Sequence, residues 1–162
     1  MKYLKGILLP ALLALAPFAT AKDEPAVTTS DFGGELVNLF YFEDSDVAVL
    51  AELETSKVFR STDAGKTWDT VKDMRTIGIL KSPFDNRVAV ALGEQKHWIT
   101  YDRGEEWTEF ETELPPSLTG MPISFHAKDN KKILYHSIED CFLTPCLGQV
   151  SLTALILRPW LT

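Results

Sequence analysis

Short runs of alternating apolar and polar residues follow one another along the chain after residue 21. Asp, Asn, Gly or Pro bounds the runs, and Val, Ile, Phe and Tyr recur inside them. Runs of this kind are typical of β-strands joined by tight turns. An amphipathic helix would need apolar residues at every third or fourth position, and no such stretch follows residue 21. The pattern therefore predicts an all-β fold.

One octapeptide occurs twice. STDAGKTW at 61–68 recurs 39 residues later as TYDRGEEW at 100–107. The flanking residues agree in kind, with a short apolar run before each copy and a strand-forming run after it. The matching positions are Ser61, Asp63, Gly65 and Trp68 in the first copy and Thr100, Asp102, Gly104 and Trp107 in the second.

The segments upstream of the octapeptides repeat as well. FEDSDVAVLAE begins at Phe42 and FDNRVAVALGE begins at Phe84, and a fainter third copy, AKDNKKILYHS, begins at Ala127. Each unit is predicted to contain four short strands, with an Asp or Asn turn early and an Asp-Gly turn late. Four-stranded units at a period near 40 are typical of propeller blades. The chain is therefore predicted to form a partial β-propeller of about three blades.

The octapeptide has two competing interpretations. Gly65-Lys66-Thr67 resembles the end of a phosphate-binding P-loop, but Arg60 stands where that motif needs its first glycine. The second copy places Glu105 and Glu106 where phosphate would approach. A turn explains the shared residues instead. The aspartate accepts amide hydrogen bonds, the glycine takes a positive φ, and the tryptophan covers the hairpin. We interpret both copies as structural corners and not as an active site.

Both ends of the chain differ from the repeats. Residues 1–21 combine a basic start, an apolar run and Ala19-Thr20-Ala21, which predicts a signal peptide cleaved after Ala21. We expect residues 22–149 to form the incomplete propeller. Residues 150–162, VSLTALILRPWLT, form a divergent tail that is expected to reflect a truncation or a gene-model artefact. Neither apolar end is long enough for a membrane span.

Charge and ligand-forming residues narrow the function. The net charge of −7, or about −9 without the two leader lysines, argues against nucleic acid or anionic lipid as a partner. Cys141 and Cys146 favour a local disulfide over free thiols or pairing with cysteines elsewhere. The histidines His97, His126 and His136 share no ligand spacing, so we expect them on strand and loop surfaces. No metal or cofactor is predicted.

The Ser/Thr-x-Asp-x-Gly-x-Thr-Trp pattern resembles the Asp-box of sialidases and other secreted propellers. Together with the leader, FGGELVNLFYFEDSDVAVLAE and ILKSPFDNRVAVALGEQKHWITYDRGEEW, it makes residues 26–149 similar to the start of the luminal domain of the sortilin family. The fungal vacuolar protein-sorting receptors belong to that family. Glu106 replaces the usual threonine, which predicts a looser second turn.

The resemblance implies a ten-bladed propeller on a type I membrane receptor. It places the chain in the secretory pathway, in the lumen of the Golgi and endosomes, or outside the cell if the chain ends at residue 162. Its implied partners are protein cargo, namely vacuolar hydrolases such as carboxypeptidase. No motif locates the cargo contacts. With about three blades, the open sheet edges and faces also predict self-association.

A secreted glycoside hydrolase is the alternative, because sialidases also carry Asp-boxes. Their chemistry needs a cluster of arginines to hold a carboxylate, with a tyrosine nucleophile and acidic partners. The arginines here are scattered: Arg60, Arg75, Arg87, Arg103 and Arg158. We therefore predict a binding protein and not an enzyme. A soluble structural adaptor is a third possibility.

Overall fold

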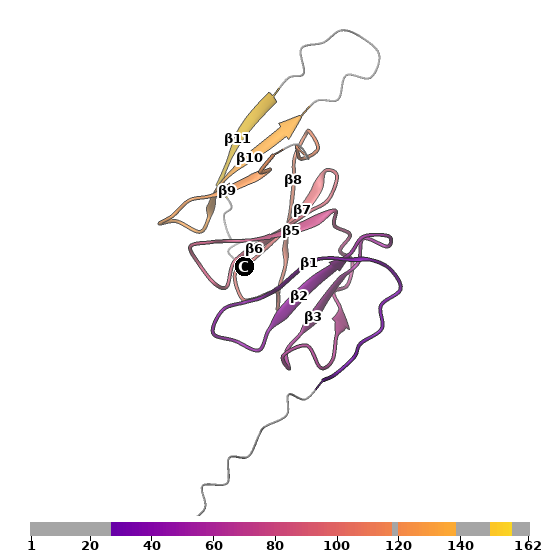
Figure 1. The fold of residues 1–162 in the computed structure, drawn as a ribbon. Helices are drawn as coiled ribbons and strands as arrows, with labels where there is room; N and C mark the ends of the chain where they lie inside the picture. Colours follow the sequence, from indigo (N-terminus) through magenta and orange to yellow (C-terminus); the bar gives the residue numbers. More distant parts are fainter. Residues whose placement is uncertain (1–26, 118–119, 139–149, 157–162) are drawn as a thin grey trace, which may run out of the picture.

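The computed structural model describes residues 27–117, 120–138 and 150–156. Within these ranges every regular element is a β-strand, which confirms the predicted all-β class. Three antiparallel sheets follow one another in space in chain order (Figure 1). We call them the first, second and third blades. The expected leader at 1–21 and the cysteines Cys141 and Cys146 lie outside the described residues.

Each blade is built from consecutive strands, so its chain runs up and down across the sheet. The first blade contains β1 (Leu36–Tyr41), β2 (Ala48–Glu52), β3 (Val58–Ser61) and β4 (Asp69–Thr70). The second contains β5 (Gly78–Lys81), β6 (Ala89–Leu92), β7 (Lys96–Thr100) and β8 (Thr108–Glu111). The third contains β9 (Ile123–Phe125), β10 (Lys132–Ile138) and β11 (Val150–Ile156).

Strand pairing makes the second and third strands of the first two blades equivalent residue by residue. Ala48 pairs with Ser61 in the first blade, as Ala89 pairs with Thr100 in the second. Leu50 pairs with Phe59, and in the second blade Ala91 pairs with Trp98. Phe59 therefore corresponds to Trp98. By the same count Glu52 corresponds to Gly93, because the amide of Glu52 donates to the carbonyl of Lys57 and the amide of Gly93 donates to the carbonyl of Lys96.

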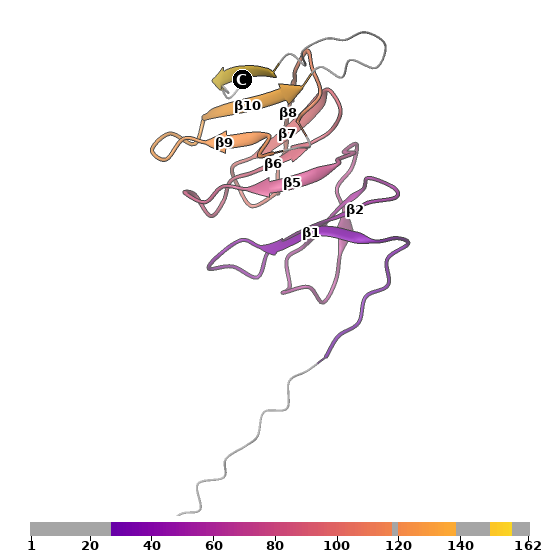
Figure 2. The same cartoon turned by 45° about the horizontal axis from the view of Figure 1, so that its top comes forward.

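The first core lies between the first and second blades. The second strands of both blades contribute to it, since Val49 and Ala51 meet Ala89 and Ala91 across the interface. The two blades also meet at β1 and β5, the edge strands with which their sheets begin (Figure 2). There Asn38, with a φ of 53°, accepts a hydrogen bond from the amide of Ile79 on its Oδ1 atom at 3.1 Å.

The second core lies between the second and third blades. Val88, Val90 and Leu92 face this interface, on the opposite side of β6 from its alanines. Ile123 and Ile133 of the third blade pack against them. A strand that is buried on both faces has a continuous run of apolar residues in its sequence. This is why Val-Ala-Val segments recur in the sequence.

The third blade includes a strand from the segment that the sequence sets apart as a tail. β11 pairs with β10 along its whole length, from Val150 opposite Ile138 to Ile156 opposite Lys132. The described part of this blade contains no Asp-box corner like those that follow the third strands of the first two blades. No helix among the described residues is long and apolar enough to cross a membrane.

Candidate functional site

The first Asp-box forms the corner between β3 and β4. Ser61 Oγ accepts a hydrogen bond from the amide of Gly65 at 2.8 Å and donates one to Asp63 Oδ1 at 2.9 Å. Asp63 also accepts bonds from the amide and the hydroxyl of Thr67, at 2.9 and 2.8 Å. The indole nitrogen of Trp68 donates to the carbonyl of Gly65 at 3.1 Å. The side chains of the motif thus satisfy the backbone of their own turn.

The second Asp-box repeats this arrangement between β7 and β8. Thr100 Oγ1 donates to Asp102 Oδ1 at 2.7 Å and accepts from the amide of Gly104 at 2.8 Å. The amides of Glu105 and Glu106 both donate to Asp102 Oδ1 at 3.0 Å. The corner therefore keeps its amide bonds to the aspartate. Glu106 removes only the hydroxyl bond that a threonine supplies.

Both corners place two successive residues in the left-handed region. Ala64 and Gly65 have φ values of 60° and 85°, and Arg103 and Gly104 have values of 64° and 77°. A side chain resists this region, which is why the second position of each pair suits glycine. A Cβ atom on Gly104 would also lie 3.4 Å from the ring of Trp107. The positive φ at both positions is therefore the reason that glycine is favoured there.

Hydrogen bonding accounts for the electrostatics of the first corner. The amide and then the hydroxyl of Thr67 lower the pKa of Asp63 to about 2, with a further contribution from Ser61. The carboxylate is therefore ionised at neutral pH and is occupied by its own turn. It is poorly suited to act as an acid or a base there.

Each corner is attached to the turn between the first two strands of its blade. The amide of Ala64 donates to the carbonyl of Asp46 at 2.9 Å, and the amide of Arg103 donates to the carbonyl of Arg87 at 3.0 Å. The bonded residues lie further apart in the sequence in the first blade, because its loop between β2 and β3 is longer than the loop between β6 and β7 in the second blade. The contact itself is the same.

The two tryptophans of the corners have different neighbours. Trp107 packs against the first core, so the first blade covers it. Among the described residues, Trp68 packs against neither of the two cores. Phe32 lies beside it instead, with ring centroids 5.9 Å apart, and Phe32 also meets Phe59 edge to face at 5.2 Å. The N-terminal segment thus occupies part of a face that is buried in the second blade.

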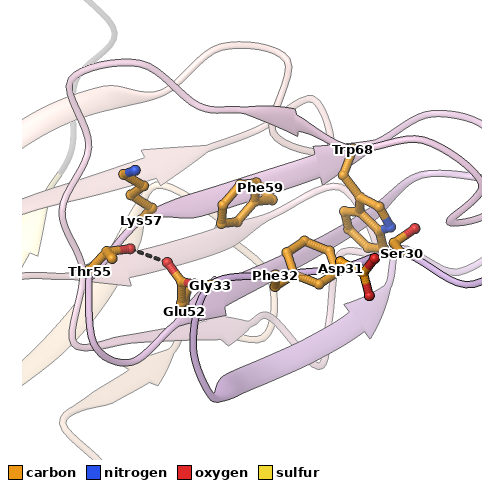
Figure 3. Close-up of a pocket in the computed structure, with 9 residues that line it drawn as sticks. All are labelled: Ser30, Asp31, Phe32, Gly33, Glu52, Thr55, Lys57, Phe59 and Trp68. Atoms are coloured by element: carbon orange, nitrogen blue, oxygen red, sulfur yellow. Dashed lines mark hydrogen bonds between the residues drawn. The ribbon is translucent and has the colours of Figure 1, made fainter.

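A pocket of about 420 Å³ lies over the same face of the first blade (Figure 3). Glu52 lines this pocket and is only 2% exposed. Its Oε2 atom accepts a hydrogen bond from the Thr55 hydroxyl, whereas its Oε1 atom is buried and has no hydrogen-bond partner among the described residues. The remaining lining residues are Ser30, Asp31, Phe32, Gly33, Lys57, Phe59 and Trp68. The sequence repeat gave no signal for this site, because Gly93 stands at the corresponding place in the second blade.

His97 corrects the expectation of surface histidines, since it is fully buried between the second and third blades. Its Nδ1 atom accepts a hydrogen bond from the amide of Gly93 at 3.3 Å, and its Nε2 atom meets Thr112 Oγ1 at 2.7 Å. Thr112 contacts the hydroxyl of Tyr135 at 3.2 Å, which links the two blades. Burial lowers the pKa of His97 to about 4. Of the other two histidines, His126 is exposed and His136 is half-buried.

The described arginines do not form the carboxylate-binding cluster of a sialidase. Arg60 bonds to the carbonyl of Arg103, Arg75 bonds to the carbonyl of Thr55, and Arg87 pairs with Asp85. Within residues 27–117, 120–138 and 150–156, no group of His, Cys, Asp and Glu is placed to hold a metal ion.

Comparison with known proteins points to one family. Residues 56–160 match the profile of the Sortilin-Vps10 family, described as sortilin, neurotensin receptor 3. The chain is 61% identical over 153 residues to a vacuolar protein sorting/targeting protein 10 of Pyrenophora tritici-repentis. A protein of the same name from Coccidioides posadasii is 41% identical over 144 residues. These alignments cover 94% and 84% of this chain. The chain spans about 10% of the length of each relative.

Proposed function

The chain belongs to the Sortilin-Vps10 family, and from this membership we propose that it is luminal, cargo-binding sequence of a vacuolar sorting receptor. The relatives are named for sorting and targeting and not for an enzymatic reaction. The proposed cargo is a soluble vacuolar hydrolase, such as a carboxypeptidase. The proposed compartment is the lumen of the Golgi and endosomes.

The observation that carries the proposal is the match over 56–160, which includes both Asp-box corners. These corners occupy equivalent positions in neighbouring blades, and the side-chain oxygens of Ser61, Asp63, Thr100 and Asp102 form hydrogen bonds within their own turns. They can therefore hold the blade edges in place but have little capacity left for chemistry. Binding would fall to the surfaces that the blades present.

A direct binding measurement tests this proposal. The chain is expressed through the secretory pathway, immobilised, and exposed to a purified carboxypeptidase of the vacuole. A secreted hydrolase of similar size and charge serves as the control ligand. We expect saturable binding of the vacuolar enzyme and none of the control. Equal binding of both enzymes, or of neither, would overturn the proposal for this chain.

A further inference from the structure

The interface between the second and third blades has a polar contact near each end of β6. In the turn before β6, Asp85 Oδ2 accepts a hydrogen bond from the side-chain amide of Asn130 at 3.0 Å. At the other end, His97 pairs with Leu92, the last residue of β6. The apolar side chains of the second core pack along the strand. Two different polar groups therefore hold the two ends of one interface.

The Asp85 contact is part of a turn that occurs in both blades. Asp85 Oδ1 accepts a hydrogen bond from the amide of Arg87 at 3.0 Å, as Asp129 Oδ1 accepts one from the amide of Lys131 at 3.1 Å. The Arg87 side chain, with help from Asn130, lowers the pKa of Asp85 to about 2. The contact therefore keeps its charged acceptor far into the acidic range. The charged and titratable groups in the same hollow are His126, Lys128 and Asp129.

The His97 contact depends on a neutral imidazole. The amide of Gly93 donates to Nδ1 at 3.3 Å, so Nδ1 is unprotonated and Nε2 carries the proton. Nε2 therefore donates to Thr112 Oγ1, 2.7 Å away. Thr112 in turn contacts the hydroxyl of Tyr135 on the third blade at 3.2 Å. A second proton, on Nδ1, would point at the Gly93 amide and so disrupt this end of the interface.

Among the described residues, no charged side chain is placed to compensate a positive charge on His97. The imidazole is fully buried against the rings of Phe110 and Tyr135, and this burial is what lowers its pKa to about 4. The four glutamates and the lysine on the segments around it are exposed, and His136 is half-buried. The titratable groups on those segments are Glu94, Lys96, Glu109, Glu111, Glu113, Tyr135 and His136.

The two ends therefore differ in their response to acid. We propose that the junction of the second and third blades is an acid-sensitive hinge, which opens at His97 while Asp85 and Asn130 stay in contact. Val58 occupies the position of His97 in the first blade and packs into the first core. The junction of the first two blades consequently has no such group at that position. Acid would change the placement of the third blade alone, whatever the cargo.

The direction of the effect follows from the two states of His97. Opening exposes the imidazole to water, where its pKa returns to about 6.5. The open form then binds a proton more readily than the closed form, so its population rises as the pH falls below about 6.5. The hinge should be closed at neutral pH and largely open near pH 4.

Isoleucine methyl groups provide a probe for each part of the hinge. The expressed chain carries carbon-13 in these methyl groups and is titrated from pH 7 to pH 4. Ile123 pairs with Tyr135, Ile133 lies three residues after Asn130, and Ile79 belongs to the first core. We expect the Ile123 resonance to shift with a midpoint between about pH 4 and about pH 6.5, Ile133 to shift less, and Ile79 to stay in place.

Three results of this titration would overturn the proposal. No shift of Ile123 would mean that the junction does not open. Equal shifts of Ile123 and Ile133 would mean that the third blade separates without a hinge. A shift of Ile79 at the same midpoint would mean that the whole chain unfolds.

A substitution identifies the titrating group. His97→Gln keeps a donor and an acceptor but cannot gain a proton, so it should abolish the shift of Ile123. His126→Gln, at an exposed position in the third blade, should titrate like the parent. A parental titration of Ile123 in the folded His97→Gln chain would contradict the proposal.

The imidazole nitrogens of the parent protein give a second measurement that needs no variant. Nitrogen-15 shifts of labelled histidine should show the proton of His97 on Nε2 at pH 7. The gain of a second proton should have the same midpoint as the shift of Ile123. A proton on Nδ1 at neutral pH, or two separate midpoints, would overturn the proposal even if His97→Gln failed to fold.

Discussion

The Nε atom of Arg60 donates a hydrogen bond to the main-chain oxygen of Arg103 at 3.1 Å. Arg60 lies in β3 of the first blade, and Arg103 lies at the apex of the second Asp-box. The bond therefore joins one blade to the corner of the next, 43 residues further along the chain. It shows that an Asp-box corner also serves as an attachment point between blades.

Replacing Arg60 should loosen this attachment. Arg60→Met keeps the apolar part of the side chain but leaves the carbonyl of Arg103 without its donor. We expect a loss of about 1 kcal/mol in the free energy of unfolding, measured by urea denaturation. Arg75→Met is the matched control, because Arg75 donates to a carbonyl from an exposed position. It should change stability by less than about 0.5 kcal/mol. Equal losses of unfolding free energy in both variants would show that the hydrogen bond between the blades contributes no more to stability than the exposed hydrogen bond of Arg75.

The corner glycines should not tolerate a side chain. Gly104→Ala and Gly65→Ala would each place a Cβ atom on a residue with a positive φ, of 77° and 85°. We expect each to lower the unfolding free energy by about 1 kcal/mol. Gly120→Ala is the control, since a Cβ atom there meets nothing within 4 Å. A loss at Gly120 as large as at Gly104 would argue against a strain at the corner.

Asp63 should make the free energy of unfolding depend on pH in the acidic range. Its pKa is about 2 in the folded protein and about 3.9 in an unfolded chain, so the folded state binds fewer protons between these values. The free energy of unfolding should therefore fall as the pH decreases from about 4 to about 2. Asp63→Asn should show a shallower fall, measured by chemical denaturation at several pH values. Identical slopes in the two proteins would contradict the assignment.

His97 should produce a second acid-sensitive range. Its pKa is about 4 when folded and about 6.5 when unfolded, so stability is complete above about pH 6.5 and is lost as the pH falls toward 4. The loss should be at most about 3 kcal/mol. His97→Gln should remove most of this dependence, whereas His126→Gln, at an exposed position, should retain it. The prediction fails if His97→Gln loses as much stability as the parent between pH 7 and pH 4.5.

The isolated chain should associate with itself. β4 and β11 lie at outer edges of their sheets and pair with no further strand in the described part of the chain. Leu39 is also 58% exposed on β1. Unpaired edges and exposed apolar side chains favour contacts between chains. Sedimentation of the chain from residue 22 to 162 should show species larger than a monomer at micromolar concentration. A sharp melting transition of a stable monomer would refute this.

The repeat allowed much of the blade structure to be predicted. The spacing of the two octapeptides and the Val-Ala-Val segments located most strands of the first two blades. These features are local: an Asp turn, a glycine with positive φ and alternating apolar residues each leave a mark within a few residues. The all-β class and the strand order within each blade followed from them.

Contacts between blades could not be predicted in the same way. His97 follows a lysine at the start of a strand, and nothing local indicates that Tyr135 closes over it from the next blade. Glu52 ends a strand as a solvent-facing residue often does, yet the N-terminal segment buries it. Phe32 precedes the repeat and has no counterpart in it. Each depends on a partner distant in sequence.

The first two blades are joined by hydrogen bonds at two separate places. Asn38 connects the first strand of one blade to the first strand of the next, and Arg60 connects the third strand of one blade to the corner of the next. A single attachment would let one sheet pivot on the other, whereas two separate attachments resist that rotation. The relative orientation of the two sheets therefore depends on polar side chains as well as on the apolar core between them.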